Sequence, residues 1–267
     1  MSYSNLHTHT VFSDGVNTLE KMVLAALEQG FVSLGFSDHS FTPFDTSYCM
    51  REEVLPAYLR ETRRLARKYE GQIEIYTGLE WDGFSELPDR AAFDYLIGDC
   101  HYVRVGEAYY SIDHDEADHK RTIRTQFGGD PLALARAYFD TYVSCQRKHR
   151  PDILGHFDLP VLYGCMPEES PVYRRMALEA LLASLEVTPL LEVNTGAIAK
   201  KRRSEPYPAV FLLREALAHG AKFVLSSDAH KAANLHFYHD ETAELLHSIG
   251  CREIVQLRKG RFEEVGI

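Results

Sequence analysis

The sequence lacks any run of about 20 apolar residues, the length that a helix needs to cross a bilayer, and this excludes a membrane-spanning protein. Its first residues carry no basic stretch followed by an apolar one, so we expect no secretory signal. The five cysteines are widely spaced and form no Cys-x-x-Cys pair, which favours reduced thiols and a cytoplasmic location. No Gly-x-Gly-x-x-Gly follows the first predicted strand, and no Gly-x-Ser-x-Gly occurs. These absences argue against a dinucleotide site and against a serine nucleophile.

Basic residues are also few. The chain of 267 residues has 29 Lys and Arg against 39 Asp and Glu, a formal net charge of −10. This balance argues against binding of a nucleic acid polymer, which needs a basic surface. It is compatible with a small phosphorylated substrate, because divalent cations in a site can reverse the local charge.

Short apolar runs alternate with longer amphipathic segments along the whole chain. The short runs predict strands at 3–7, 31–37, 73–78, 94–99, 152–155, 189–193 and 222–226, and a final strand or edge at 253–257. The amphipathic segments predict helices at 19–29, 51–69, 131–148, 170–186, 208–219 and 242–248. We expect the polar segment 103–128 to be an irregular lid or substrate loop. Repeated strand–helix units predict an α/β fold. Seven such units fit a distorted (β/α)7 barrel of TIM-like type better than an open sheet.

Histidines and carboxylates follow the predicted strands. His7 and His9 end the first run, and residues two apart in a strand point to the same side, so both imidazoles can reach one metal ion. The C-terminal ends of the strands of a parallel barrel open on one face. That face would collect nine candidate metal ligands: His7, His9, Asp14, His39, Glu80, His101, His156, Asp228 and His230.

Each of these positions has an alternative interpretation on its own. His39 after Asp38 could belong to a buried hydrogen-bonded pair, and Glu80 beside Trp81 to a buried salt bridge. Their joint placement favours a site for two or three divalent ions, because without metal the carboxylates would repel one another. We interpret the remaining histidines as structural or exposed: His114 and His119 in an acidic loop, His149, His219 and His247 at helix ends, and His236 and His239 on the surface.

The order of these motifs resembles the polymerase-and-histidinol-phosphatase (PHP) superfamily. The motifs are His7-Thr8-His9, Asp38-His39, Glu80, Gly98-Asp99-Cys100-His101, Gly155-His156-Phe157-Asp158 and Ser227-Asp228-Ala229-His230. The resemblance implies a distorted seven-stranded barrel with three divalent ions, in a single domain over residues 1–267. It implies that His7, His9, Glu80 and Asp228 hold the first ion, that Glu80 shares a second ion with His101 and His156, and that Asp14, His39 and His230 hold a third.

The layout is most similar to the stand-alone histidinol-phosphate phosphatases of this superfamily, and the resemblance implies hydrolysis of L-histidinol phosphate in histidine biosynthesis. A hydroxide between two ions would attack phosphorus, while Asp228, His230 and His39 act as catalytic groups. Lys200, Lys201, Arg202, Arg203 and Tyr207 are candidate phosphate or substrate contacts, although a basic run of this kind can equally be a solvated loop. Tyr102 and Asp113 are further candidates for recognising the alcohol.

One departure leaves the substrate open. The residues after the fifth predicted strand, Leu159-Pro160-Val161-Leu162-Tyr163, contain no cation where relatives often carry one. The alternatives are a phosphoesterase for nucleotides or cyclic phosphodiesters, or a metal-binding module without catalysis. His and carboxylate ligands suit Zn, Mn and Fe alike, so the metal also stays open, as does the oligomeric state.

Overall fold

The computed structural model describes residues 3–86 and 89–267, so Met1 and Ser2, which belong to the segment read for a signal, lie outside it. In this part of the chain seven parallel strands form one sheet in the order β1-β2-β3-β4-β7-β8-β9. They are β1 (Tyr3–Asn5), β2 (Phe31–Phe36), β3 (Glu74–Asp82), β4 (Tyr95–Asp99), β7 (Ile153–Leu154), β8 (Leu190–Asn194) and β9 (Lys222–Ser226).

The sheet curls until its first and last strands meet just beyond their C-terminal ends. Thr8 and Ala229 form a parallel bridge, in which His9 N donates to Ala229 O at 3.0 Å and Ala229 N donates to His7 O at 3.2 Å. This nearly closed arrangement confirms the predicted distorted (β/α)7 barrel. The seam joins the segment of His7 and His9 to the segment of Asp228 and His230.

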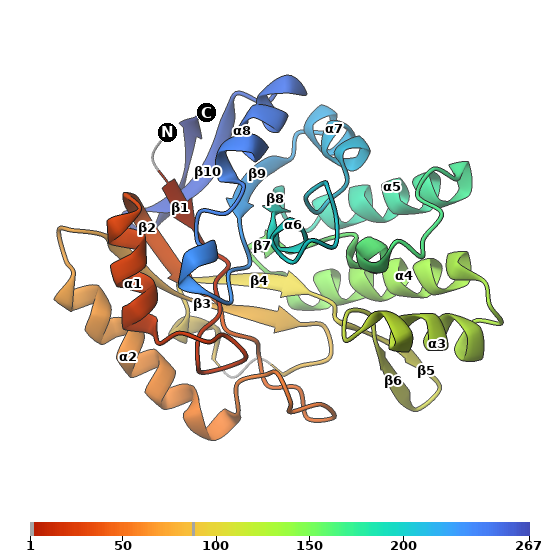
Figure 1. The fold of residues 1–267 in the computed structure, drawn as a ribbon, viewed down its shortest axis with the longest axis horizontal. Helices are drawn as coiled ribbons and strands as arrows, with labels where there is room; N and C mark the ends of the chain where they lie inside the picture. The colour runs from red at the N-terminus through yellow and green to blue at the C-terminus, as the bar shows by residue number, and fades with distance from the viewer. Residues whose placement is uncertain (1–2, 87–88) are drawn as a thin grey trace.

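Helices cover the outside of the strands. They are α1 (Leu19–Glu28), α2 (Leu55–Lys68), α3 (Glu116–Gln126), α4 (Pro131–His149), α5 (Pro171–Leu185), α6 (Gly196–Ala199), α7 (Val210–Ala218) and α8 (His239–Ser248). Figure 1 shows α1 and α2 on one side of the strands and α3, α4 and α5 on the opposite side. Thr18 and Asp130 cap α1 and α4, since their side chains accept from Lys21 N and Leu132 N.

The apolar core lies both inside and outside the barrel. Inside, buried side chains of the strands pack with Val255 and Leu257, which come from β10 (Glu253–Arg258). β10 pairs antiparallel with β11 (Arg261–Gly266), a strand that the pattern did not predict. Outside, larger clusters join the helices to the sheet. Among the described residues no helix combines the length and the apolar character that crossing a bilayer requires.

The segment 103–128 differs from the expected irregular loop. It contributes to the antiparallel hairpin of β5 (Tyr102–Val105) and β6 (Ala108–Ser111), followed by α3. Its polar composition hid the helix, because α3 buries only a narrow face that includes His119 and Ile123. Two helix boundaries also differ: residues 52–54 form a 3₁₀ turn before α2, whose second residue is Pro56, and α8 begins at His239 rather than at 242.

Candidate metal centre

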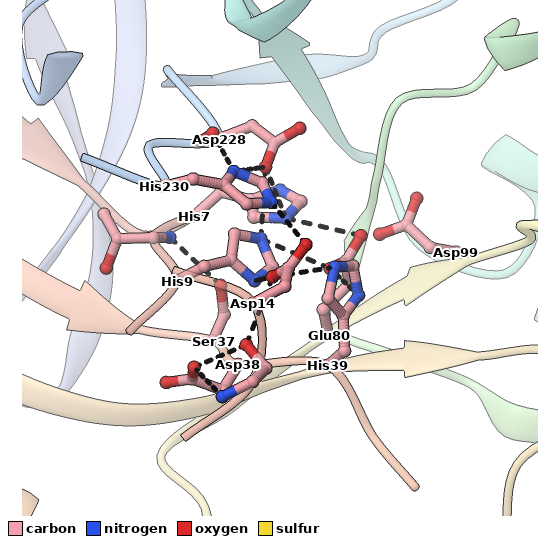
Figure 2. A network of polar contacts seen from close by, with 12 residues as sticks. His7, His9, Asp14, Ser37, Asp38, His39, Glu80, Asp99, Asp228 and His230 are labelled. Carbon is pink, nitrogen blue, oxygen red and sulfur yellow. Dashed lines mark hydrogen bonds and ion pairs between the residues drawn. The ribbon is translucent and has the colours of Figure 1, made fainter. Parts of the chain in front are cut away.

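The predicted ligands meet at the C-terminal mouth of the barrel. His7 and His9 follow β1, His39 follows β2, His101 follows β4, His156 follows β7, and Asp228 and His230 follow β9. Glu80 differs slightly from the prediction, because β3 continues to Asp82 and Glu80 lies within the strand. Figure 2 shows four of the imidazoles gathered with Asp14, Glu80 and Asp228. All nine predicted residues therefore face one small region.

Glu80 occupies the centre of this region and is 1% exposed. Its Oε1 lies 2.9 Å from His156 Nε2, 3.3 Å from His101 Nε2 and 3.4 Å from His7 Nε2. Its Oε2 lies 2.6 Å from His39 Nδ1 and 3.4 Å from His9 Nε2. One carboxylate thus reaches five imidazoles through two oxygens, which is the arrangement expected of a group that two ions share.

Asp14 and His230 form the outer side of the cluster. His230 Nε2 lies 3.1 Å from Asp14 Oδ2, and His39 Nε2 lies 3.7 Å from Asp14 Oδ1. The side chains of Asp14 and His230 are 32% and 19% exposed, whereas those of His7 and Glu80 are 0% and 1% exposed. The cluster therefore runs from a sealed inner end to an outer end that water reaches.

Asp228 joins the inner and outer ends. Its Oδ1 lies 3.1 Å from His9 Nε2 and 3.4 Å from His230 Nδ1. The backbone at Asp228 has a φ of 48°, in the left-handed region that a residue with a Cβ rarely adopts. Such strain persists only where the surrounding structure enforces it, and here it directs the carboxylate into the cluster.

Charge within the cluster holds its carboxylates ionised. Burial alone would raise the pKa of Glu80, but the imidazoles of His39, His7 and His101 keep it well below its usual value. Burial likewise opposes ionisation of Asp228, yet Lys200 and His7 lower its pKa well below the usual value. Burial, His230 and His39 together lower the pKa of His9 to about 3, so His9 is neutral. A neutral imidazole beside ionised carboxylates is the donor set that a divalent cation binds.

Buried polar atoms without hydrogen bonds also indicate that the cluster binds metal. Within the described chain, His7 Nε2, both ring nitrogens of His9 and Glu80 Oε2 are buried and make no well-directed hydrogen bond, although ionisable groups lie close to them. Unpaired buried polar atoms cost free energy, so a concentration of them at one point indicates a missing partner. Four overlapping groups bring ligand atoms within 4.8 Å of one another: His9, Asp14, His39 and His230; His7, His9 and Glu80; His39, Glu80 and His101; and Glu80, Asp99 and His156. The residues present fit divalent ions.

Three carboxylates behind the cluster were not predicted to have a role. Glu192 Oε1 lies 2.6 Å from His7 Nδ1, Asp82 Oδ2 lies 3.2 Å from His101 Nδ1, and Asp99 Oδ1 lies 3.0 Å from His156 Nδ1. In each case the opposite ring nitrogen, Nε2, faces Glu80. Carboxylates in this position orient histidines that bind metal. Spacing was an available signal, because Asp82 lies two residues after Glu80 and Asp99 two before His101.

Asp38 fixes the turn that carries Asp14. Its Oδ1 accepts from Thr10 N at 2.8 Å, from Ser13 N at 3.1 Å and from Ser13 Oγ at 2.6 Å. The turn packs tightly on the His9 backbone, because a Cβ on Gly15 would lie 2.4 Å from His9 C. The Asp-Gly of the sequence is therefore required on both counts: Asp14 faces the cluster and Gly15 permits the close approach.

A cavity of about 330 Å³ opens directly above the cluster. Of the four basic candidates, Lys200 and Arg202 line it, as do Tyr207, Tyr102 and Asp113. Among the described residues that line this cavity, Lys201 and Arg203 do not appear. Arg203 instead donates to both carboxylate oxygens of Glu168 at 3.0 Å, which makes it a structural residue. No cation comes from residues 159–163, where Leu159, Leu162 and Tyr163 form an uncharged wall.

Several other histidines differ from their predicted settings. His239 is 1% exposed rather than on the surface, and burial followed by His236 lowers its pKa to about 3. His119 is also 1% exposed and its Nδ1 lies 2.8 Å from Ile112 O, so it is part of the core of α3. His149 ends α4 as predicted, but it stacks on Trp81, and burial followed by Lys148 lowers its pKa to about 4. It is neutral rather than a cation at the helix end. His219 and His247 lie at helix ends as predicted.

The comparisons agree with this site. Residues 5–196 match the model of the PHP domain. A protein of Deinococcus radiodurans named "Probable histidinol-phosphatase" is 28% identical over 263 residues, which cover 94% of each chain. The histidinol-phosphatase of Bacillus subtilis is 27% identical over 261 residues, covering 89% of this chain and 97% of that one.

A solved structure shows the same fold. Histidinol phosphate phosphatase from Lactococcus lactis, complexed with Zn, L-histidinol and phosphate, superposes with a TM-score of 0.71 at 19% identity and covers 97% of this chain and 98% of its own. With the family model matched over most of the length and the ligand motifs assembled at one barrel mouth, this chain belongs to the PHP domain family.

Proposed function

We propose that the protein is a metal-dependent phosphatase that hydrolyses L-histidinol phosphate to L-histidinol and phosphate, in the cytoplasm and as a step of histidine biosynthesis. The observation that carries the proposal is the gathering of nine His, Asp and Glu side chains beneath a cavity of about 330 Å³, with five imidazoles around the carboxylate of Glu80 at its centre. The relatives named as histidinol-phosphatases, which match along most of their own length, support the choice of substrate. A purely structural metal site would need fewer ligands and no cavity.

Three divalent ions, of Zn, Mn or Fe, fit the donor set. His7, His9, Glu80 and Asp228 would hold the first, Glu80, His101 and His156 the second, and Asp14, His39 and His230 the third. When bound, such ions supply a water of lowered pKa as the nucleophile and neutralise charge on the phosphate. Because the barrel strands come from residues 3–226 and the ligands from residues 7–230, we treat the chain as a single catalytic domain.

The chain's own residues position the phosphate and its leaving group. Lys200 lines the cavity close enough to Asp228 to lower the pKa of that carboxyl, which places its ammonium beside the ligand cluster. Arg202 lines the same side, and Tyr207 presents a buried hydroxyl that has no partner among the described residues. These groups would bind the non-bridging oxygens. His230 and His39 lie at the more exposed end of the cluster, where either would stabilise the departing alkoxide as a protonated imidazole when it does not hold the third ion.

The acidic residues of the cavity suit the alcohol part of the substrate. Asp113 and Asp45 line the cavity, and Tyr102 Oη donates to Asp45 Oδ2 at 2.7 Å. A substrate with a phosphate and a cationic amine matches a cavity that is lined by both Lys200 and these carboxylates. Histidinol phosphate has this distribution of charge.

A substrate panel tests the proposal. The protein is stripped with a chelator, reloaded with Mn²⁺ or Zn²⁺, and assayed for phosphate release from histidinol phosphate, an aryl phosphate, mononucleotides and a cyclic phosphodiester. We expect a clear preference for histidinol phosphate and no turnover after stripping. Preference for a nucleotide or a diester would replace the substrate, and full turnover without metal would overturn the mechanism.

A matched pair of variants adds a test of the ligand set. His101→Ala should lose bound metal and reduce kcat by more than roughly a hundredfold, beyond the effect of removing an outer hydrogen-bond partner. His247→Ala, at an exposed helix end, should leave both unchanged. Normal turnover in His101→Ala would refute the assignment.

A further inference from the structure

We propose that Glu192 is a positioning residue that sets the tautomer of His7 and couples the two inner parts of the metal centre. The inference rests on the proposed metal centre, but not on the choice of substrate. Glu192 lies on β8 and is 1% exposed. Glu192 is not among the described residues that line the cavity, so it acts through other residues.

The carboxylate of Glu192 joins four segments of the barrel mouth. Oε1 lies 2.6 Å from His7 Nδ1 and accepts from Ser226 Oγ at 2.5 Å. Oε2 accepts from the backbone N of His156 at 2.7 Å and from Asn194 Nδ2 at 3.1 Å. These partners follow or end β1, β9, β7 and β8 respectively. A single buried group therefore ties the seam of the barrel to the strand that carries His156.

The hydrogen bonds determine which nitrogen of His7 carries a proton. A backbone N–H and an amide N–H can only donate, so Oε2 accepts, and Oε1 accepts from Ser226 Oγ; acceptance at both oxygens is the pattern of a carboxylate, which leaves the proton of the His7 contact on Nδ1. With Nδ1–H directed at Glu192, the other ring nitrogen, Nε2, faces Glu80 Oε1 at 3.4 Å and Asp228 Oδ1 at 3.8 Å. Nε2 is therefore the atom of His7 that can coordinate an ion held between these two carboxylates.

Glu192 has a wider reach than the other carboxylates behind the cluster. Asp99 approaches the ring of His156, and Asp82 approaches His101. Glu192 acts on the ring of His7 and on the backbone of His156, and the Nε2 atoms of both residues face the same oxygen of Glu80. Displacement of Glu192 would therefore shift a ligand of the first ion and a ligand of the second together.

The sharpest variant is Glu192→Gln, which keeps size and shape. The amide group of this variant has two orientations. If its nitrogen faces His156 N and Asn194 Nδ2, hydrogen-bond donors face one another. If its nitrogen faces His7, the imidazole must accept at Nδ1, and its N–H then points from Nε2 toward the metal. We expect Zn²⁺ or Mn²⁺ affinity, measured by equilibrium dialysis of the full chain with the metal alone, to fall roughly 10- to 100-fold with loss of metal stoichiometry. Ser226→Ala removes one donor to Glu192 Oε1 but keeps the contact that requires a proton on His7 Nδ1, so this variant should bind metal nearly as the wild type does.

A measurement on the wild type keeps the proposal testable if Glu192→Gln does not fold. Long-range ¹H–¹⁵N spectra of the Zn²⁺-loaded protein should show His7 protonated at Nδ1 and coordinated through Nε2, with assignment by comparison with His7→Gln. Coordination through Nδ1, or wild-type metal affinity in a folded Glu192→Gln, would overturn the proposal. Neither readout uses histidinol phosphate, so failure of the phosphatase assay with these results intact would remove the proposed function and leave the positioning role.

Discussion

Asp38 accepts a hydrogen bond from Ser13 Oγ at 2.6 Å, and through it a fully buried carboxylate on one loop sets the position of Asp14 on another. Asp38→Ala should remove four hydrogen bonds to the 10–13 turn, lower the free energy of unfolding by about 1–3 kcal/mol and reduce occupancy of the outer metal site. Asp38→Asn is the control, because its amide oxygen can accept the three bonds of Oδ1 while its nitrogen donates to Thr10 Oγ1. Chemical denaturation and metal analysis measure both effects. Equal metal loss in the two variants would contradict the explanation.

The gradient of exposure across the cluster predicts stepwise loss of metal. Asp14 and His230 are the most exposed ligands, at 32% and 19%, and the ligands around Glu80 are almost fully buried. During titration with a chelator, we expect one equivalent to leave well before the rest, with loss of activity. The melting temperature should fall mainly with the later equivalents, whose ligands hold the seam of the barrel. Simultaneous release of all metal would contradict this order.

Lys200 and Arg203 should behave differently although they are three residues apart. Lys200→Ala should reduce kcat roughly a hundredfold with little change in stability, because its ammonium lines the cavity. Arg203→Ala should destabilise the fold by about 1.5–3 kcal/mol, because it breaks charged hydrogen bonds to Glu168, and should affect kcat less. Lys201→Ala, exposed and away from the cavity, serves as the control. Kinetics and urea unfolding of the three variants separate the roles, and a catalytic defect larger in Arg203→Ala than in Lys200→Ala would refute them.

The stack of His149 on Trp81, with ring centroids 3.7 Å apart, predicts a pH effect on stability. Burial and then Lys148 lower the pKa of His149 from 6.5 to about 4, so the unfolded chain binds more protons between these values. The contribution of His149 is therefore complete above pH 6.5 and is lost as the pH falls toward 4. His149→Phe should keep the stack and show a smaller loss of stability between pH 7 and pH 5.

Urea midpoints of metal-free protein measure this difference without interference from metal release. His247→Phe, at an exposed position, should retain the pH dependence of the wild type. A parallel decline in His149→Phe and the wild type would show that His149 does not contribute.

The gathering of the candidate ligands at one barrel mouth could be predicted from sequence, because parallel strands bring their C-terminal ends to one face whatever the details of packing. Glu192 could not be assigned in this way. A carboxylate in an apolar strand looks the same whether it faces a salt bridge or a histidine, and its partner His7 lies 185 residues away. The same limit applies to Arg203, whose partner Glu168 comes from a separate turn, so the basic run could not be divided into cavity and structural residues. The prediction for the polar segment 103–128 was wrong for another reason. Its hairpin and helix each bury too little apolar surface to produce a clear periodicity.

The barrel closes between Thr8 and Ala229, so the candidate metal centre can be assembled only near the end of translation. A ribosome releases His7, His9 and Asp14 first, while His230 follows Asp14 by 216 residues. Until β9 emerges, the histidine pair has no Asp228 opposite it and the seam has no second edge. The proposed first and third sites therefore gain their last ligands only after β9 has been made, whereas Glu80, His101 and His156 precede it. In a nascent chain that stalls before β9, His7 and His9 lack Asp228, and their imidazoles are open to other cations.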